Sequence, residues 1–134
     1  MPLRWYTVVV DCHDIAAQSR WWAQTLGWKL VYEADDEVVI VPEHMSDQPI
    51  EDLAAWLEAG QALIFVTVPE GKSVKNRLHI DLAPHTTQDR DAEIAALLAR
   101  GATRVDIGQT GDESWTVLAD PEGNEFCVLS ARNR

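Results

Sequence analysis

The strongest constraint on the fold is an internal repeat along the 134 residues. The order strand, helix, glycine and three strands occurs twice. The spacing from Thr7 to Gly27 is close to that from His79 to Gly101, and these glycines end the two predicted helices. The repeat therefore predicts an α+β fold of two βαβββ modules, about residues 1–70 and 71–134 of a single domain. Thr7 and His79 hold equivalent places in the two modules.

The first module is predicted to begin with a β-branched and aromatic strand and to continue through three more. These runs lie at residues 4–11, 28–33, 37–41 and 62–68. Asp14 is typical of a helix N-cap, and apolar residues follow it at helical spacing. On this helix Trp22 lies on the apolar stripe, whereas its neighbour Trp21 is expected to be half-exposed.

Residues 42–61 interrupt the repeat. Pro49 and the apolar residues after it predict a short amphipathic helix with an acidic outer face. A surface excursion is one interpretation of this segment. The other is a lid or a dimer contact around Trp56.

The second module is expected to hold strands near residues 77–82, 104–107, 115–119 and 125–130. A helix begun by Thr87 or Asp89 follows the first of them. Before the last strand, residues 120–124 (Asp-Pro-Glu-Gly-Asn) predict a tight turn, because proline presets φ and glycine accepts positive φ.

Alternation in two of these strands points to a candidate site. Beyond the turn, Glu125 and Cys127 share one strand face, opposite Phe126 and Val128. In the strand at 77–82, His79 likewise lies on the polar face. The two strands therefore direct an imidazole and a carboxylate into whatever these faces line.

Composition limits the partners of the chain. A net charge of −11 argues against nucleic acid, which needs a basic surface. No apolar run approaches the roughly 20 residues of a membrane span, and no signal-peptide pattern is present at the start. The two cysteines, Cys12 and Cys127, make no disulfide framework, so a reducing cytoplasm is the expected location. Six tryptophans are many for this length and favour binding clefts or interfaces.

Motifs along nearly the whole chain resemble the vicinal oxygen chelate superfamily, the glyoxalase and bleomycin-resistance proteins. The closest likeness is to its small glyoxalase-like group. The motifs lie at residues 10–14, 21–28, 77–82, 98–102 and 118–126. The resemblance implies paired βαβββ modules that form a cupped mixed sheet, with a small-molecule ligand in the cup. It also implies a homodimer, which would cover exposed sheet edges.

The resemblance implies metal ligands on the first strand of each module and on late strands. His79 matches the ligand position of the second module, and Glu125 matches the carboxylate of the last strand. The first-module position, usually His, Glu or Gln, falls on Thr7, whose hydroxyl is a poor ligand. Since catalytic sites usually supply three protein ligands, we expect no tightly bound metal and no other cofactor.

Three functional hypotheses follow. In the first, the chain binds a small organic molecule without a metal. In the second, it is a metal-dependent lyase, isomerase or dioxygenase in which His79 and Glu125 hold Zn, Ni, Fe, Mn or Mg, and Glu125 is a catalytic proton shuttle. In the third, it is a non-catalytic structural or regulatory domain, and Glu125 only pairs with Arg77 or His79. Whether the chain is an enzyme stays open.

Strand parity predicts one cavity for the ligand-binding residues. They are Thr7, Arg77, His79, Trp115, Glu125 and Cys127. Trp115 either packs in the core or stacks on a planar or cationic ligand. Cys127 is interpreted as an inert pocket thiol, because the sequence places no base beside it.

Overall fold

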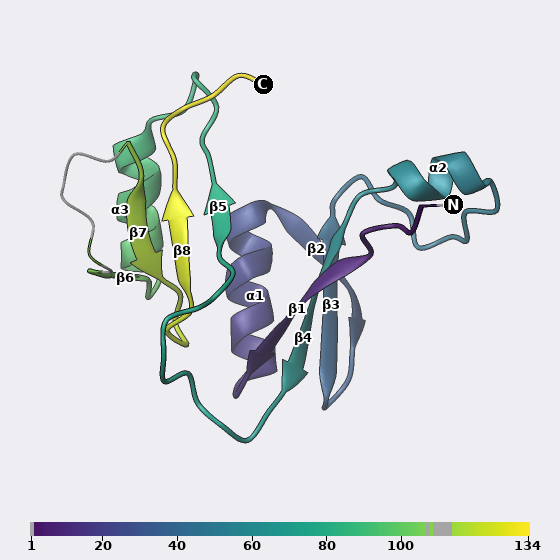
Figure 1. Cartoon of the computed structure of the whole chain (residues 1–134), viewed down its shortest axis with the longest axis horizontal. Coiled ribbons are helices and arrows are strands. Elements are labelled where there is room, and N and C mark those ends of the chain that lie inside the picture. Colours follow the sequence, from purple (N-terminus) through teal and green to yellow (C-terminus); the bar gives the residue numbers. More distant parts are fainter. Residues whose placement is uncertain (1, 107, 109–113) are drawn as a thin grey trace. The chain divides into compact units, whose positions relative to one another are not determined.

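The computed structural model describes residues 2–106, 108 and 114–134, and the chain divides into two compact units, Met1–Gly71 and Lys72–Arg134. Each unit is a βαβββ module with its own four-stranded mixed sheet (Figure 1). The predicted α+β fold is confirmed. The expected strand end at Ile107 lies outside the described residues.

The first unit has the sheet order β1-β4-β3-β2, in which β1 runs parallel to β4 and the other neighbours are antiparallel. Its elements are β1 (Thr7–Cys12), α1 (Ile15–Leu26), β2 (Trp28–Glu33), β3 (Glu37–Pro42), α2 (Leu53–Glu58) and β4 (Ala62–Thr67). The short helix expected in the interrupting segment is therefore present as α2. It begins after Asp52, later than Pro49 indicated.

Local signals fix the ends of α1. The Asp14 carboxylate accepts a hydrogen bond from the Ala17 N–H at 3.1 Å, and Gly27 adopts the left-handed conformation that ends the helix.

The prediction of a half-exposed Trp21 is wrong, since Trp21 and Trp22 are only 7% and 3% exposed. Adjacent helical positions differ by about 100°, so the two indoles can meet edge to face, with centroids 5.2 Å apart.

The second unit repeats the topology of the first, with the sheet order β5-β8-β7-β6. Its elements are β5 (Ile80–Leu82), α3 (Arg90–Ala99), β6 (Thr103–Arg104), β7 (Thr116–Ala119) and β8 (Glu125–Val128). Asp89 caps α3 by accepting a hydrogen bond from the Ala92 N–H.

Strand β5 is shorter than the sequence pattern predicts. Ile80 pairs with Phe126, the second residue of β8. In this register, residues 77 and 78 lie opposite the chain that precedes β8. There the chain makes its tight turn and offers no strand to pair with. Arg77 and Leu78 consequently form a bend, and His79 directly precedes the strand.

The two faces of the second sheet have different roles. Arg90 of α3 donates hydrogen bonds to the Thr116 hydroxyl and the Val128 carbonyl, which places these strand positions on the helix side. The opposite face carries residues of the other parity, paired across the strands. We call it the site face; it holds Asp81, Val117, Ala119, Glu125 and Cys127.

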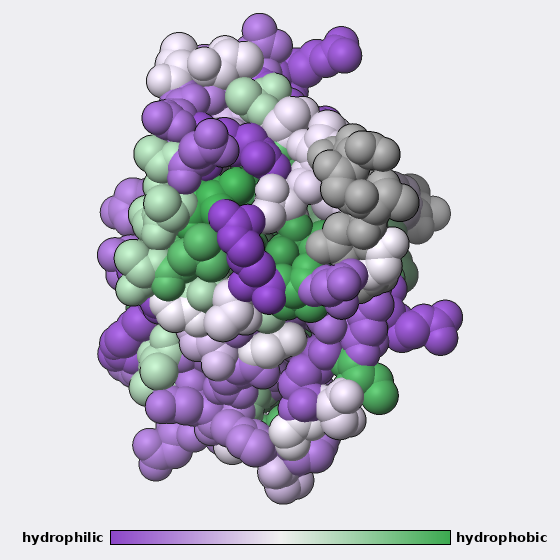
Figure 2. All heavy atoms as spheres, turned by 90° about the vertical axis from the view of Figure 1, so that its left-hand side faces the viewer, coloured by the Kyte–Doolittle hydropathy of each residue, from purple (hydrophilic) through white to green (hydrophobic). Residues whose placement is uncertain are grey.

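The surface is rich in charge, as the composition requires. Figure 2 shows the side of the chain on which α3 lies, and it is mostly hydrophilic, with hydrophobic atoms gathered near the centre of the view. Among the described residues, none of the helices is long and apolar enough to cross a membrane.

Candidate functional site

A tight turn positions Glu125 at the start of β8. The Asp120 carboxylate accepts hydrogen bonds from the Glu122 and Asn124 N–H groups, both at 3.0 Å. Gly123 supplies the positive φ of 92° that the turn needs, as its sequence predicted. The turn thus closes directly before Glu125, whose side chain enters the site face.

Glu125 is an engaged carboxylate. One of its oxygens lies 2.9 Å from the Lys72 ammonium, and the other accepts a hydrogen bond from the Asn76 N–H at 3.0 Å. Lys72 also donates to the Val74 carbonyl. Burial acts to raise the pKa of Glu125, which is only 9% exposed, but the Asn76 N–H and the Lys72 ammonium outweigh it and hold the pKa below its ordinary value.

The partner of Glu125 is therefore Lys72, rather than Arg77 or His79. Sequence reasoning missed Lys72 because it lies in an irregular segment without periodicity. The available signal is that two lysines, Lys72 and Lys75, stand close together in the segment before β5 in an otherwise acidic chain.

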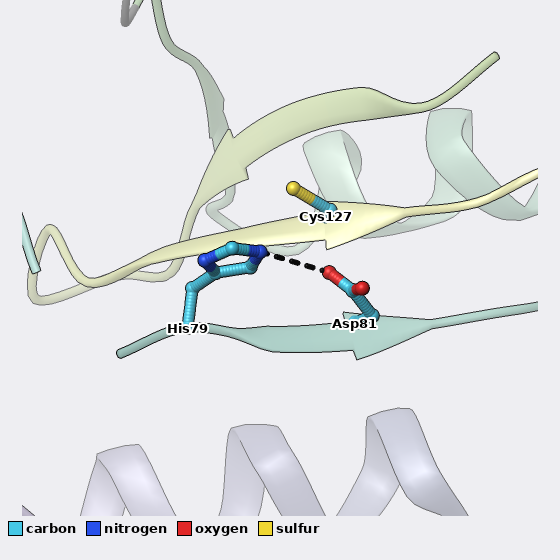
Figure 3. A group of neighbouring side chains, drawn as sticks. All are labelled: His79, Asp81 and Cys127. Carbon is cyan, nitrogen blue, oxygen red and sulfur yellow. Dashed lines mark ion pairs between the residues drawn. The ribbon is translucent and has the colours of Figure 1, made fainter. Parts of the chain in front are cut away.

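His79, Asp81 and Cys127 form a second group on the site face (Figure 3). The His79 Nε2 lies 3.1 Å from an Asp81 carboxylate oxygen. One donor atom from each of the three residues lies within 4.8 Å of the others. The His79 and Asp81 side chains are 44% and 47% exposed, whereas Cys127 is only 5% exposed.

The Cys127 thiol is not activated in this group. Burial raises the pKa of Cys127, and the charge of Asp81 and a hydrogen bond to it raise it further, while Lys75 acts in the opposite direction. Because the thiolate is the nucleophilic form, this environment favours an inert thiol.

Three further residues of the predicted site are Thr7, Trp115 and Arg77. Thr7 belongs to the first unit, and its hydroxyl lies 3.0 and 3.1 Å from the Val8 and Ala62 carbonyl oxygens. Trp115 directly precedes β7 and is 42% exposed. Arg77 is exposed in the bend before β5. The convergence of Thr7 with the residues of the second unit stays a prediction.

The first unit has a hollow of its own, about 460 Å³ in volume, which sequence reasoning did not single out. His13, Asp14, Glu33 and Asp35 are among the residues that line it, beside the start of α1. Its acidic groups have local roles, since Asp14 caps α1 and Glu33 pairs with Arg20 at 2.7 Å. The hollow is therefore a weaker candidate than the site face.

The family model of the glyoxalase-like domain matches residues 7–129. No curated protein matches the chain. The fold is similar to that of a glyoxalase/bleomycin resistance protein/dioxygenase family enzyme from Burkholderia phytofirmans PsJN, with a TM-score of 0.67 and 17% identity over 97% of this chain and 100% of that one. It is also similar to a glyoxalase/bleomycin resistance protein from Albidiferax ferrireducens T118 (TM-score 0.57, 19% identity, 96% and 98% covered). A third similar structure is the bleomycin-binding protein from bleomycin-producing Streptomyces verticillus, complexed with copper(II)-bleomycin (TM-score 0.56, 14% identity, 98% and 99% covered).

Proposed function

The chain belongs to the glyoxalase-like domain family of the vicinal oxygen chelate superfamily, and we propose that it binds a small organic molecule in the cup of its sheet. In this proposal, no divalent metal is held by His79 and Glu125. Trp115, His79 and Cys127 contact the bound molecule together with Glu125, and Arg77 completes its surroundings.

The observation that carries the proposal is the state of Glu125. Both of its carboxylate oxygens are engaged, one by the Lys72 ammonium and the other by the Asn76 N–H. To bind a metal ion, Glu125 would have to release Lys72, which already neutralises its charge. The Thr7 hydroxyl, close to two carbonyl oxygens, adds no strong donor. These residues do not fit a three-ligand ion, and the metal-dependent lyase, isomerase or dioxygenase is the weaker candidate.

The chemistry of the site face supports an organic ligand. Small-molecule sites combine mostly apolar walls with a few polar groups that fix orientation. On this face, Val117, Ala119 and Cys127 are apolar and buried, and Glu125 is a polar group among them. The half-exposed indole of Trp115 offers a surface on which a planar or cationic group can stack. The bleomycin-binding protein has a similar fold and is complexed with copper(II)-bleomycin, which favours the same use here.

A thermal-shift screen tests the proposal. The untagged protein is incubated, with and without EDTA, with a library of planar, cationic and drug-like molecules that includes bleomycin; copper(II)-bleomycin is added only in the arm without EDTA. We expect at least one metal-free molecule to raise the melting temperature, and calorimetry then gives its Kd.

Two variants assign the site. Trp115→Ala should weaken binding about 2- to 10-fold, the range for loss of an aromatic stacking contact. Tyr32→Ala removes an exposed aromatic side chain from β2 of the first unit and serves as the matched control. A screen without any hit, or hits that vanish in EDTA, would contradict the proposal.

A further inference from the structure

Register brings three chemically different donors together on the site face. Asp81 of β5 pairs with Cys127 of β8, and the two side chains lie on the same side of the sheet (Figure 3). His79 lies two residues before Asp81 and so projects to that side as well. We propose that His79, Asp81 and Cys127 form a three-ligand site for a zinc-class ion.

The distances allow such a site after a small closure. A tetrahedral zinc ion with bonds of about 2.0–2.3 Å holds its donors about 3.3–3.8 Å apart. The His79 and Asp81 donors are 3.1 Å apart, and all three donors lie within 4.8 Å of one another. Closing the site needs movements of about 1 Å, on the scale of those bond lengths. His79 can supply them, because its side chain is half-exposed and it lies outside the strand pairing.

The donor set selects the ion. Thiolate and imidazole suit Zn²⁺ and Co²⁺, whereas Mg²⁺ and Ca²⁺ require oxygen ligands throughout. In the described part of the chain, no other trio of His, Cys, Asp or Glu side chains brings its donors this close.

The exposure of the site gives the ion an open position. Three protein ligands leave a fourth tetrahedral place, as in zinc sites that bind water or substrate. His79 and Asp81 are half-exposed, so this place is open to water or to an oxygen, nitrogen or sulfur atom of a bound molecule. The inference goes beyond the proposed function, because it uses His79 without Glu125 and leaves the Lys72–Glu125 pair intact.

Binding exchanges a proton for the ion without any redox step. The Cys127 S–H bond is broken, the proton goes to solvent, and a sulfur–metal bond forms. Since the ion must displace this proton and close the site, we expect loading when metal is added, rather than full occupancy of the protein as isolated.

Cobalt titration of the untagged protein under anaerobic conditions tests the site directly. One equivalent of Co²⁺ should produce a near-ultraviolet sulfur-to-metal charge-transfer band, and added Zn²⁺ should remove it. Cys127→Ser should abolish the band and weaken Zn²⁺ binding more than 10-fold, since even loss of an outer-shell partner costs about 10–100-fold. Asp81→Asn, at a half-exposed position, should weaken Zn²⁺ binding comparably.

Matched controls cover each ligand type. Cys12→Ser removes the other thiol, and His44→Gln removes an exposed imidazole of the first unit; both should retain the band. Absence of the sulfur band in the unmodified protein would overturn the proposal. So would loss of the ion in Glu125→Gln together with its retention in Cys127→Ser, which would place the metal at Glu125. The screen in EDTA is independent of these outcomes, so failure of the ion site and failure of the organic ligand are distinguishable.

Discussion

Glu125 and Cys127 lie two residues apart on one face of β8, yet their surroundings favour opposite charge states. Burial acts to raise the pKa of both groups. For Glu125, the Asn76 N–H and the Lys72 ammonium reverse that effect. For Cys127, the neighbouring Asp81 adds to it. Glu125 is therefore held as a charged carboxylate, whereas Cys127 is held as a neutral thiol that a metal ion or a stronger base would have to deprotonate.

Acid should weaken the fold through Glu125. Its pKa in the folded protein is lowered from 4.5, so its contribution to stability is present above that ordinary value and is lost as the pH falls through the folded pKa. We expect the free energy of unfolding to fall more steeply below about pH 4.5 in the unmodified protein than in Glu125→Gln. Urea denaturation of both proteins across pH 3–7 measures this. Parallel curves would contradict the prediction.

Lys72→Met should destabilise the second unit by about 1–3 kcal/mol, because a buried carboxylate then loses its charged partner. Lys75→Met removes a lysine that donates to the Asn76 carbonyl at 3.3 Å on the surface and should change stability by less than about 0.5 kcal/mol. Denaturant unfolding measures both variants.

The double variant Lys72→Met/Glu125→Gln provides the internal check. Removing the charge of Glu125 should recover part of the loss, since no unpaired carboxylate remains. Additive losses would mean that the two side chains do not interact in solution.

At the scale of elements, the sequence predicts most of the architecture for identifiable reasons. Asp14 and Asp89 mark helix starts because their carboxylates accept backbone N–H groups, and Gly27 marks an end because it adopts positive φ. Periodicity failed where pairing ends. The alternation of residues 77–79 looks like a strand, but the register places residues 77 and 78 opposite the turn before β8, and the pairing begins only at Ile80.

The candidate site was predictable to the same extent. Cys127 follows from strand parity, which the sheet register preserves, and His79 keeps the predicted side although it lies outside the paired strand. Lys72 could not be found in this way, because an ion pair between an irregular segment and a strand leaves no periodic signal. The proximity of Asp81 to Cys127 needed the register itself, which fixes which residues of β5 and β8 are opposite each other.

Removing the N-cap should lower global stability for α3, which packs into the core, but not for α2, which does not. Asp89→Ala should cost about 1 kcal/mol, because α3 loses its N-cap and packs Ile94 and Leu97 into the core. Asp52→Ala removes the equivalent cap of α2, which has no buried residues, and should barely change global stability. Urea denaturation gives the global effects, and hydrogen exchange should show that α2 alone opens in Asp52→Ala. Equal global losses would mean that α2 contributes to the core.

At the scale of the whole molecule, the repeat is the organising feature. Both units use the same strand order, with the first strand of each module at an edge and parallel to the last. This arrangement leaves β1 and β2 as the edges of the first sheet. Strand β2 carries a register shift between Leu30 and Tyr32, and such bulges protect edges from pairing. Strand β1 has no such irregularity along its pairing with β4.

We therefore expect a homodimer that uses the β1 edge. Trp5 and Tyr6, directly before β1, and Val9 within it are exposed apolar residues, a combination that favours an interface. Trp56, which the sequence suggested for the contact, lies under the Arg4 guanidinium at 4.9 Å, and its part in a dimer stays a prediction. Sedimentation velocity across micromolar concentrations should give twice the 15.0 kDa monomer mass.

Trp5→Asp should shift the protein to monomer, because two added charges meet at a twofold contact in a chain that already carries −11. Val31→Asp places the same charge on the exposed, bulged edge of β2 and should leave the dimer intact. A monomer at every concentration would contradict the dimer, and dissociation by Val31→Asp alone would place the contact on β2.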